Sequence, residues 1–302
     1  MNVNHTRPPF VRNILIAAMA MVFICIAGQS VVFAQIDPQP VTTPRPRKPL
    51  PEPANPKIPF LILIGDSTVR NGQGDGGGGQ WGWGEPLVEY FDAAKINVAN
   101  RAIGGLSSRT YLTGGFWDKT LPMIKPGDFV MIQFGHNDGG EVNDPARARA
   151  SIKGTGSETV EIDNVLTKKH ETVYTYGWYL RKFIADIRAK GATPILCSLI
   201  PRKIWKDGKI VRNSTDYGKW AADVAVSDKV PFIDLNNVIA EEYDKMGEAK
   251  VDPMFGDPHT HTSLAGAQMN AEIVVKGLKA MKKDPLANFY SEKGKQIRKI
   301  GK

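Results

Sequence analysis

Cysteine is almost absent from this sequence. The 302 residues include two cysteines, and Cys25 lies in an apolar N-terminal stretch that no lipidation pattern precedes. Cys197 stands in the apolar run 194–200, where an inert core thiol is the expected role. With only one cysteine beyond the N-terminal stretch, a disulfide framework is excluded and the core must stabilise the fold. A chain of this length with 42% apolar residues can supply such a core.

Acidic residues are absent from the first 34 positions. Arg7 and Arg12 precede the apolar run 14–27, and the tripeptide Val-Phe-Ala ends at Ala34. A basic region, a hydrophobic region and a small-residue cleavage site are typical of a secretory signal peptide, cut here after Ala34. The run is short for a membrane span, so we expect a secreted or periplasmic mature chain without a membrane span. An uncleaved anchor is the alternative.

Basic stripes with interleaved aromatic residues are also absent, which argues against nucleic-acid binding. The formal charge of +8 falls to +6 without the two arginines of the signal peptide, and this excess favours encounter with a polyanionic substrate. No internal repeat is found. Eight prolines between residues 35 and 58 predict a stiff tether. The chain thus divides into a signal peptide (1–34), a proline-rich linker (35–58) and one domain (59–302).

From residue 60 onward, short apolar runs alternate with helical patterns. The runs predict strands over 60–64, 96–100, 129–134, 193–199 and 230–234, and the intervening segments predict helices over 85–94, 172–190, 216–227 and 263–282. Apolar strands separated by helices are typical of a parallel sheet covered on both faces. We therefore predict an α/β fold, a three-layer doubly wound (flavodoxin-like) sandwich with a five-stranded parallel sheet. Ligands of such sheets bind beyond the carboxyl ends of the strands.

Four short motifs lie at predicted strand ends or before the last helix. They are GDST (65–68), GGLSSRT (104–110), GHND (135–138) and DPHTH (257–261). Each alone has an ordinary explanation, such as a helix cap for the serine or a tight turn for the glycines. Together they place a serine, backbone donors, an amide side chain and an Asp/His pair at one rim of the sheet. These are the components of acyl transfer by a serine nucleophile.

The four motifs resemble those of the SGNH (GDSL-type) hydrolases, in the order found in that superfamily. The longer strings FGHNDGG, YGWYLRKFIADIRAKGATPILCSLIPR and HTHTSLAGA resemble its rhamnogalacturonan acetylesterase branch. The resemblance covers residues 57–283 and implies the SGNH hydrolase fold. It also implies that Ser67 is the nucleophile. The oxyanion donors would be the backbone N–H groups of Ser67 and Gly105 and the side-chain amide of Asn137.

The last motif departs from the usual Asp-x-x-His spacing of the superfamily. Asp257 lies four residues before His261 and two before His259. We expect His261 to be the base, because HTSLAGA runs directly into the last predicted helix as the family's segment does. Asp257 would then hold its imidazole, and His259 would line the substrate pocket.

Aromatic and basic residues near the motifs are candidates for substrate binding. Trp81 and Trp83, in the glycine-rich segment after the serine, are placed to stack on a sugar ring, or alternatively to pack beneath a loop. Arg109 and Arg202 follow strand ends and suit a uronate carboxylate. The alternative for both arginines is to hold loops through carbonyl groups.

Two other interpretations have less support. Gly74, Gly76 and Gly79 match G-x-G-x-x-G, but the segment is so rich in glycine that the match says little about a dinucleotide site. The aspartate and histidines of the last motif could bind a metal together with His136, but this would leave the serine and the asparagine without a role.

The sequence as a whole predicts a secreted serine esterase that removes O-acetyl groups from carbohydrate, with a pectic (rhamnogalacturonan-type) polysaccharide as the favoured substrate. No cofactor and no metal are expected. The expected partner is an acetylated polysaccharide or oligosaccharide, and the expected state is a monomer. Two alternatives stay open: an esterase for another acetylated glycan or a small acyl ester, and a non-catalytic polysaccharide-binding protein.

Overall fold

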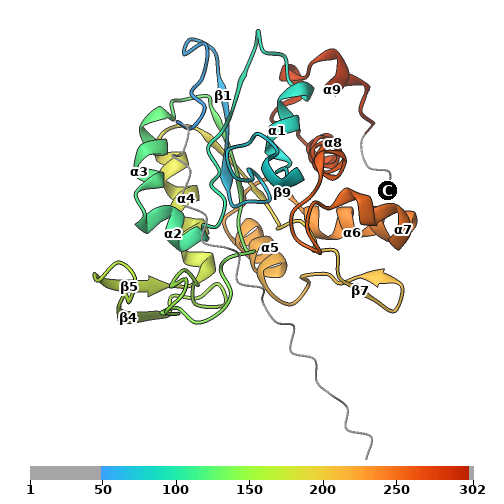
Figure 1. Ribbon diagram of the computed structural model, residues 1–302. Coiled ribbons are helices and arrows are strands. Elements are labelled where there is room, and N and C mark those ends of the chain that lie inside the picture. The colour runs from blue at the N-terminus through green and yellow to red at the C-terminus, as the bar shows by residue number, and fades with distance from the viewer. Residues whose placement is uncertain (1–48, 299–302) are drawn as a thin grey trace, which may run out of the picture. The chain divides into compact units, whose positions relative to one another are not determined.

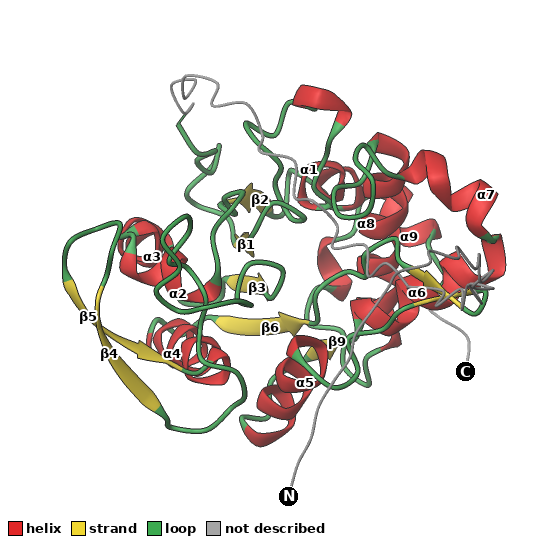
Figure 2. Cartoon of the chain, turned by 60° about the horizontal axis from the view of Figure 1, so that its bottom comes forward, coloured by secondary structure: helices red, strands yellow, loops and turns green. Residues whose placement is uncertain are grey.

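Five parallel strands form the central sheet in the computed structural model, which describes residues 49–298 (Figures 1 and 2). The strands are β1 (Phe60–Gly65), β2 (Asn97–Asn100), β3 (Phe129–Gln133), β6 (Thr193–Cys197) and β9 (Phe232–Ile233). They lie in the order β2-β1-β3-β6-β9. Because the chain moves outward in one direction from β1 and then in the other from β3, the predicted doubly wound arrangement is confirmed.

The first strand shows why the apolar runs become buried strands. All six residues of β1 are buried. Side chains alternate between the two faces of a strand, so Leu61 and Leu63 join one core cluster while Ile62 and Ile64 join the other. Polar residues therefore begin only where the chain leaves the sheet, after Gly65.

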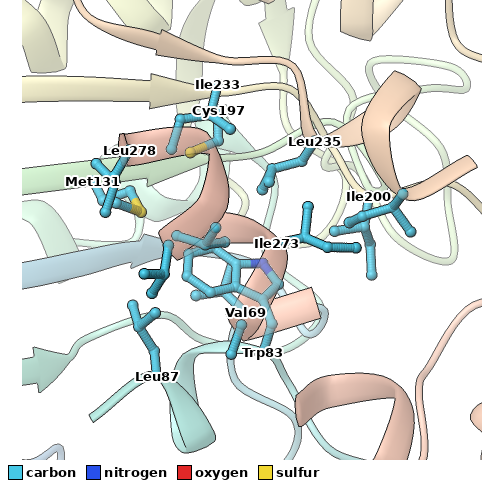
Figure 3. Packing of buried hydrophobic residues seen from close by; sticks show 14 of the residues in the cluster. Val69, Trp83, Leu87, Met131, Cys197, Ile200, Ile233, Leu235, Ile273 and Leu278 are labelled. Atoms are coloured by element: carbon cyan, nitrogen blue, oxygen red, sulfur yellow. The ribbon is translucent and has the colours of Figure 1, made fainter. Parts of the chain in front are cut away.

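Helices cover both faces of this sheet (Figure 1). They are α1 (Gly84–Leu87), α2 (Ser108–Thr113), α3 (Phe116–Thr120), α4 (Tyr176–Ala189), α5 (Tyr217–Ser227), α6 (Leu235–Met246), α7 (Glu248–Val251), α8 (Leu264–Ala280) and α9 (Glu292–Gln296). Side chains of α1, α6 and α8 pack in the cluster of Leu61, part of which Figure 3 shows, and α4 and α5 pack in the cluster of Ile62.

The helix predicted over 172–190 begins later than expected. Residues 170–174 form strand β5 (His170–Tyr174), which pairs with β4 (Thr159–Asp163) in an antiparallel hairpin. The β-branched and aromatic residues of this stretch favour a strand. The helix starts only after Thr175, whose side chain caps it by accepting a hydrogen bond from the N–H of Trp178.

The helix predicted over 85–94 is shorter than expected. It ends at Leu87 and continues only as a 3-10 turn through Tyr90, because Phe91 then pairs with Tyr290 from the C-terminal segment. A second small hairpin was not predicted, nor were helices α2, α3, α6, α7 and α9. That hairpin is formed by β7 (Trp205–Lys206) and β8 (Lys209–Ile210).

The N-terminal predictions fall only in part on the described residues. The predicted signal peptide and residues 35–48 of the linker lie outside them. The remainder of the linker contacts the domain, since Arg101 Nη1 donates to the carbonyls of Leu50 and Pro51. No helix between residues 49 and 298 is long and apolar enough to cross a membrane.

One largely buried acid beside the sheet, Glu85, predicts a pH-dependent stability. Burial raises the pKa of Glu85 to about 8, against the opposing effect of Arg70. The folded state therefore keeps a proton that the unfolded chain loses above about pH 4.5, so stability falls as the pH rises towards 8. Between pH 5 and pH 8 we expect the native protein to lose about 3 kcal/mol of unfolding free energy. Glu85→Gln, which cannot ionise, should not show this loss. Urea unfolding at both pH values measures this. The exposed Glu158→Gln is the control, and equal shifts for both variants would refute the assignment.

Candidate active site

Ser67 lies just beyond the carboxyl end of β1, where the strand order reverses. In doubly wound sheets this switch point is the usual ligand site. Gly65 stands opposite Gln133 of β3 in the register, so the segments that follow the two strands meet at the same rim. The chain turns directly after the strand, because the N–H groups of Val69 and Arg70 both donate to the carbonyl of Asp66. This turn holds the serine at the rim with 8% of its surface exposed.

Three side chains from distant parts of the sequence form a continuous hydrogen-bonded row. His261 Nε2 lies 2.8 Å from Ser67 Oγ, and His261 Nδ1 lies 2.5 Å from Asp257 Oδ2. Because an ionised Asp257 can only accept, Nδ1 carries a proton and Nε2 is left to accept the serine hydroxyl. A Ser-His-Asp row is recognised by this geometry and not by its order in the chain.

Asp257 is held by its own loop, which in turn fixes the imidazole. Its Oδ1 accepts the backbone N–H groups of His259, Thr260 and His261 at 3.0, 2.6 and 3.0 Å. Burial alone would raise the pKa of Asp257. The hydrogen bonds from the His261 side chain and from the backbone outweigh burial and hold the pKa well below its ordinary value. The carboxylate thus stays ionised and can stabilise an imidazolium.

The unusual Asp–His spacing is accommodated by the same loop. The chain wraps around Asp257, so the histidine four positions later returns to its carboxylate. His259 is exposed, and its Nδ1 lies 2.5 Å from Thr260 Oγ1. Directly after the loop, Ser263 caps α8 by accepting the N–H of Gly266. The structure therefore places His261, and not His259, against the serine.

The predicted oxyanion donors lie on loops beside Ser67. Asn137 Nδ2 donates to the carbonyl of Leu106 at 2.9 Å, which orients the amide and leaves its second N–H for a ligand. The backbone N–H groups of Ser67 and Gly105 donate to no acceptor among residues 49–298. Gly105 has a φ of 82°, a conformation that favours glycine. Gly104 lies so close to the serine that an added Cβ would be 3.4 Å from the serine Cβ.

A buried pair that the sequence did not predict joins the first and third motifs. Asp66 Oδ1 accepts the N–H and hydroxyl of Thr68 at 2.9 and 2.7 Å, and Asp66 Oδ2 lies 3.2 Å from His136 Nδ1. Burial would raise the pKa of Asp66, but His136 and Thr68 together lower it. Because each partner is the sequence neighbour of a proposed catalytic group, the pair fixes the serine relative to the asparagine.

Arg149 and Asp138 brace the glycine loop of the second motif. Arg149 Nη1 donates to the carbonyl of Gly105 at 2.6 Å, and Ser107 Oγ donates to the carbonyl of Arg149 at 2.5 Å. Asp138 accepts from the hydroxyl and the N–H of Ser108. Burial raises the pKa of Asp138 to about 6, although Ser108 opposes the shift. No motif marks Arg149, whereas Asp138 could have been found as the last residue of GHND.

The two tryptophans occupy different environments. Trp83 is 1% exposed and lies in the core (Figure 3), and its Nε1 donates to Gln133, so the prediction that it binds substrate is wrong. Trp81 is partly exposed and packs under the glycine-rich segment, where a Cβ on Gly76 would lie 2.4 Å from its ring. The backbone N–H of Trp81 donates to the carbonyl of Thr262, and the backbone carbonyl of Trp81 accepts from the Thr262 hydroxyl. Trp81 thereby anchors the loop that carries the histidine.

The two arginines also differ. Arg109 is fully buried and donates to both carboxylate oxygens of Glu171, at 2.6 and 2.7 Å, and to two main-chain carbonyls. The prediction that it meets a uronate is therefore wrong, since its donors are used to hold loops. Arg202 is exposed, and its Nη2 donates to the carbonyl of His136 at 3.3 Å. It thus lies beside the loop of the proposed oxyanion donor.

The metal interpretation finds no cluster to support it in the part of the chain that is described. Between residues 49 and 298, no group of three or more His, Cys, Asp and Glu side chains is arranged to hold a metal ion. The two histidines of interest each pair with an aspartate, His136 with Asp66 and His261 with Asp257.

Removal of the amide donor tests the oxyanion site. We expect Asn137→Ala to lower kcat for aryl acetates by about 10²- to 10³-fold, because loss of one preorganised donor costs on the order of 3 kcal/mol in the transition state. Asn143→Ala, which also removes an asparagine bonded to a main-chain carbonyl, is the matched control and is expected to keep full activity. Steady-state rates decide, and an Asn137 variant within twofold of the native rate would argue against the donor role.

Comparison with known proteins places this geometry among ester hydrolases. Residues 63–269 match the GDSL-like lipase/acylhydrolase family. The rhamnogalacturonan acetylesterase of Emericella nidulans is 28% identical over 72% of this chain and 84% of its own length. The probable rhamnogalacturonan acetylesterase YesY of Bacillus subtilis is 32% identical over 73% of this chain and 93% of its own. The solved structure of Bacillus subtilis YxiM has a TM-score of 0.58 at 25% identity over 74% of this chain, which spans 56% of that structure.

Proposed function

The chain belongs to the GDSL-like lipase/acylhydrolase family and is a carbohydrate acetylesterase, and on that premise we propose that its natural substrate is an acetylated pectic polysaccharide of the rhamnogalacturonan type. The observation that carries the reaction class is the Ser67–His261–Asp257 row beside backbone N–H groups that find no acceptor in the described part of the chain. This arrangement supplies a nucleophile, a base and donors for a developing negative charge.

The reaction follows from the positions of the protons. His261 Nε2 takes the proton of Ser67 Oγ as the oxygen attacks the acetyl carbonyl, and the carbonyl oxygen becomes an oxyanion facing Asn137 and the backbone donors. His261 then returns the proton to the sugar oxygen as the ester bond breaks. An acetyl-serine remains and the deacetylated sugar leaves. Water, deprotonated by the same imidazole, releases acetate and restores the serine.

The choice of a pectic substrate rests on three observations. Two relatives with high coverage carry rhamnogalacturonan acetylesterase in their names. The chain has an excess of basic residues, which favours encounter with an acidic polymer. Arg202 is exposed beside the oxyanion loop, and its guanidinium suits a uronate carboxylate.

The signal-like residues 1–34 support action outside the cytoplasm, and mass spectrometry of the mature N-terminus, expected at Gln35, would test this.

Acetate release from a panel of polymers tests the substrate. We expect the highest kcat/KM on acetylated rhamnogalacturonan, with lower values on acetylated xylan and on acetylated neutral glycans. Arg202→Ala is expected to raise KM on the uronate-containing polymer and to leave KM for 4-nitrophenyl acetate unaltered. A preference for xylan, or an Arg202 variant with native KM on the acidic polymer, would contradict the pectic assignment.

A further inference from the structure

A cavity of about 170 Å³ lies beside the loop that carries Asn137. Gly135, His136 and Gly139 of that loop form one side, and residues of the 199–217 region form the other. Its volume corresponds to about six water molecules at about 30 Å³ each, which is the scale of one sugar ring and not of an oligosaccharide. None of the proposed catalytic side chains lines it, so the reaction as described leaves the cavity without a role.

Two buried polar atoms of residues that line this cavity have no hydrogen-bond partner within residues 49–298. Tyr217 is 9% exposed, and its hydroxyl has no hydrogen-bond partner among the described residues. Asp216 Oδ1 is likewise buried and unpaired there, while its Oδ2 accepts from Asn213 Nδ2 at 3.1 Å. Buried donors and acceptors are nearly always paired, because leaving one unpaired destabilises the protein. The cavity therefore offers one donor and one acceptor to a ligand that brings hydroxyl groups.

The tyrosine hydroxyl has a fixed direction. Its ring meets Tyr176 edge-on at 5.1 Å and Trp220 at 4.8 Å between ring centres. Gly139 leaves space in front of it, since a Cβ there would lie 3.5 Å from the Tyr217 hydroxyl. Burial, together with the carboxylates of Asp138 and Asp216, raises the pKa of Tyr217, so the group stays protonated and can donate.

The rest of the cavity combines an apolar wall with a cationic rim. Leu199, Ile204 and Val211 form the wall, and the latter two are exposed. Arg202 lines the same cavity, with one hydrogen bond to the main chain at 3.3 Å. An apolar wall next to groups that hydrogen-bond to hydroxyls fits a pyranose with a methyl substituent. The guanidinium of Arg202 fits a carboxylate on the next residue of a polymer.

We propose that this cavity is a sugar subsite that binds a 6-deoxyhexose residue adjacent to the acetylated residue. Tyr217 donates to one ring hydroxyl, Asp216 accepts from another, the methyl group lies against the apolar wall, and Arg202 faces the carboxylate of an adjoining uronic acid. The assignment rests on the proposed function, since it requires a polysaccharide chain that runs past Ser67. It adds the residues that would select an alternating deoxyhexose–uronate backbone.

The test compares a substrate that reaches the cavity with one that does not. For Tyr217→Phe and Asp216→Asn, kcat/KM is measured on acetylated rhamnogalacturonan oligosaccharides and on 4-nitrophenyl acetate. We expect kcat/KM on the oligosaccharides, divided by kcat/KM on 4-nitrophenyl acetate, to fall about tenfold in each variant. Tyr243→Phe is the matched control, because it removes a buried hydroxyl on the opposite face of the sheet and should leave the ratio at its native value.

A binding measurement separates this proposal from the proposed function. In the Ser67→Ala background, calorimetry with deacetylated rhamnogalacturonan oligosaccharides should show a Kd about tenfold weaker once Tyr217→Phe is added. If the native protein deacetylates the oligosaccharide but both variants match Tyr243→Phe, the subsite is overturned and the function stands. If no acetate is released yet binding depends on Tyr217, the function is overturned and the subsite stands. Absence of both release and binding overturns both.

Discussion

Replacing Ser67 with alanine is expected to lower kcat/KM for 4-nitrophenyl acetate by at least about 10⁴-fold. The serine oxygen is the atom that lies 2.8 Å from His261 Nε2, and alanine offers no atom to form the acetyl-enzyme. The oxyanion donors stay in place, so a small residual rate from bound water is expected. Initial rates at saturating and limiting substrate measure the loss.

Two controls separate loss of the nucleophile from loss of the fold. The Ser67 hydroxyl contacts only His261 among the hydrogen bonds of the described residues, so the alanine variant should unfold within about 1 kcal/mol of the native protein. Ser157→Ala, at an exposed serine, should keep full activity. A serine-directed phosphonate should label the native protein once and the Ser67 variant not at all. Retention of more than about 1% activity by that variant would exclude the serine as nucleophile, and a native protein that resists labelling would favour a non-catalytic binder.

The sheet was predictable because the strands are marked by their own residues and not by contacts with distant parts of the chain. Strands β1, β3, β6 and β9 lie in apolar runs, and burial on both faces favours such runs whatever lies beyond them. The hairpin β4–β5 was not predictable in this way. Val173 is its only buried residue, so no apolar run marks it, and its second strand adjoins the start of α4 and extends the apparent helix. The end of α1 depends on a partner 199 positions away, since Phe91 pairs with Tyr290.

The proposed catalytic residues could be named because short motifs carry them, whereas their supporting contacts are long-range. Arg109 follows a strand end as a substrate-binding arginine would, yet its partner Glu171 is 62 positions away and gives no signal in the second motif. Trp83 differs from Trp81 in burial, which sequence spacing does not encode. The Tyr217 hydroxyl lacks a partner among the described residues because of packing alone, so its sequence neighbours would not mark it.

Exchange of each histidine separately tests the assignment of the base. We expect His261→Ala to lose about 10⁴-fold in kcat/KM for 4-nitrophenyl acetate, because the group that accepts the serine proton is removed. His259→Ala should lose at most about fivefold, since within residues 49–298 its ring hydrogen-bonds only with the Thr260 hydroxyl and its backbone N–H still donates to Asp257. Added imidazole should partly restore the His261 variant. An active His261→Ala beside an inactive His259→Ala would reverse the assignment, and a His259 effect confined to KM on the polymer would place that ring at the pocket.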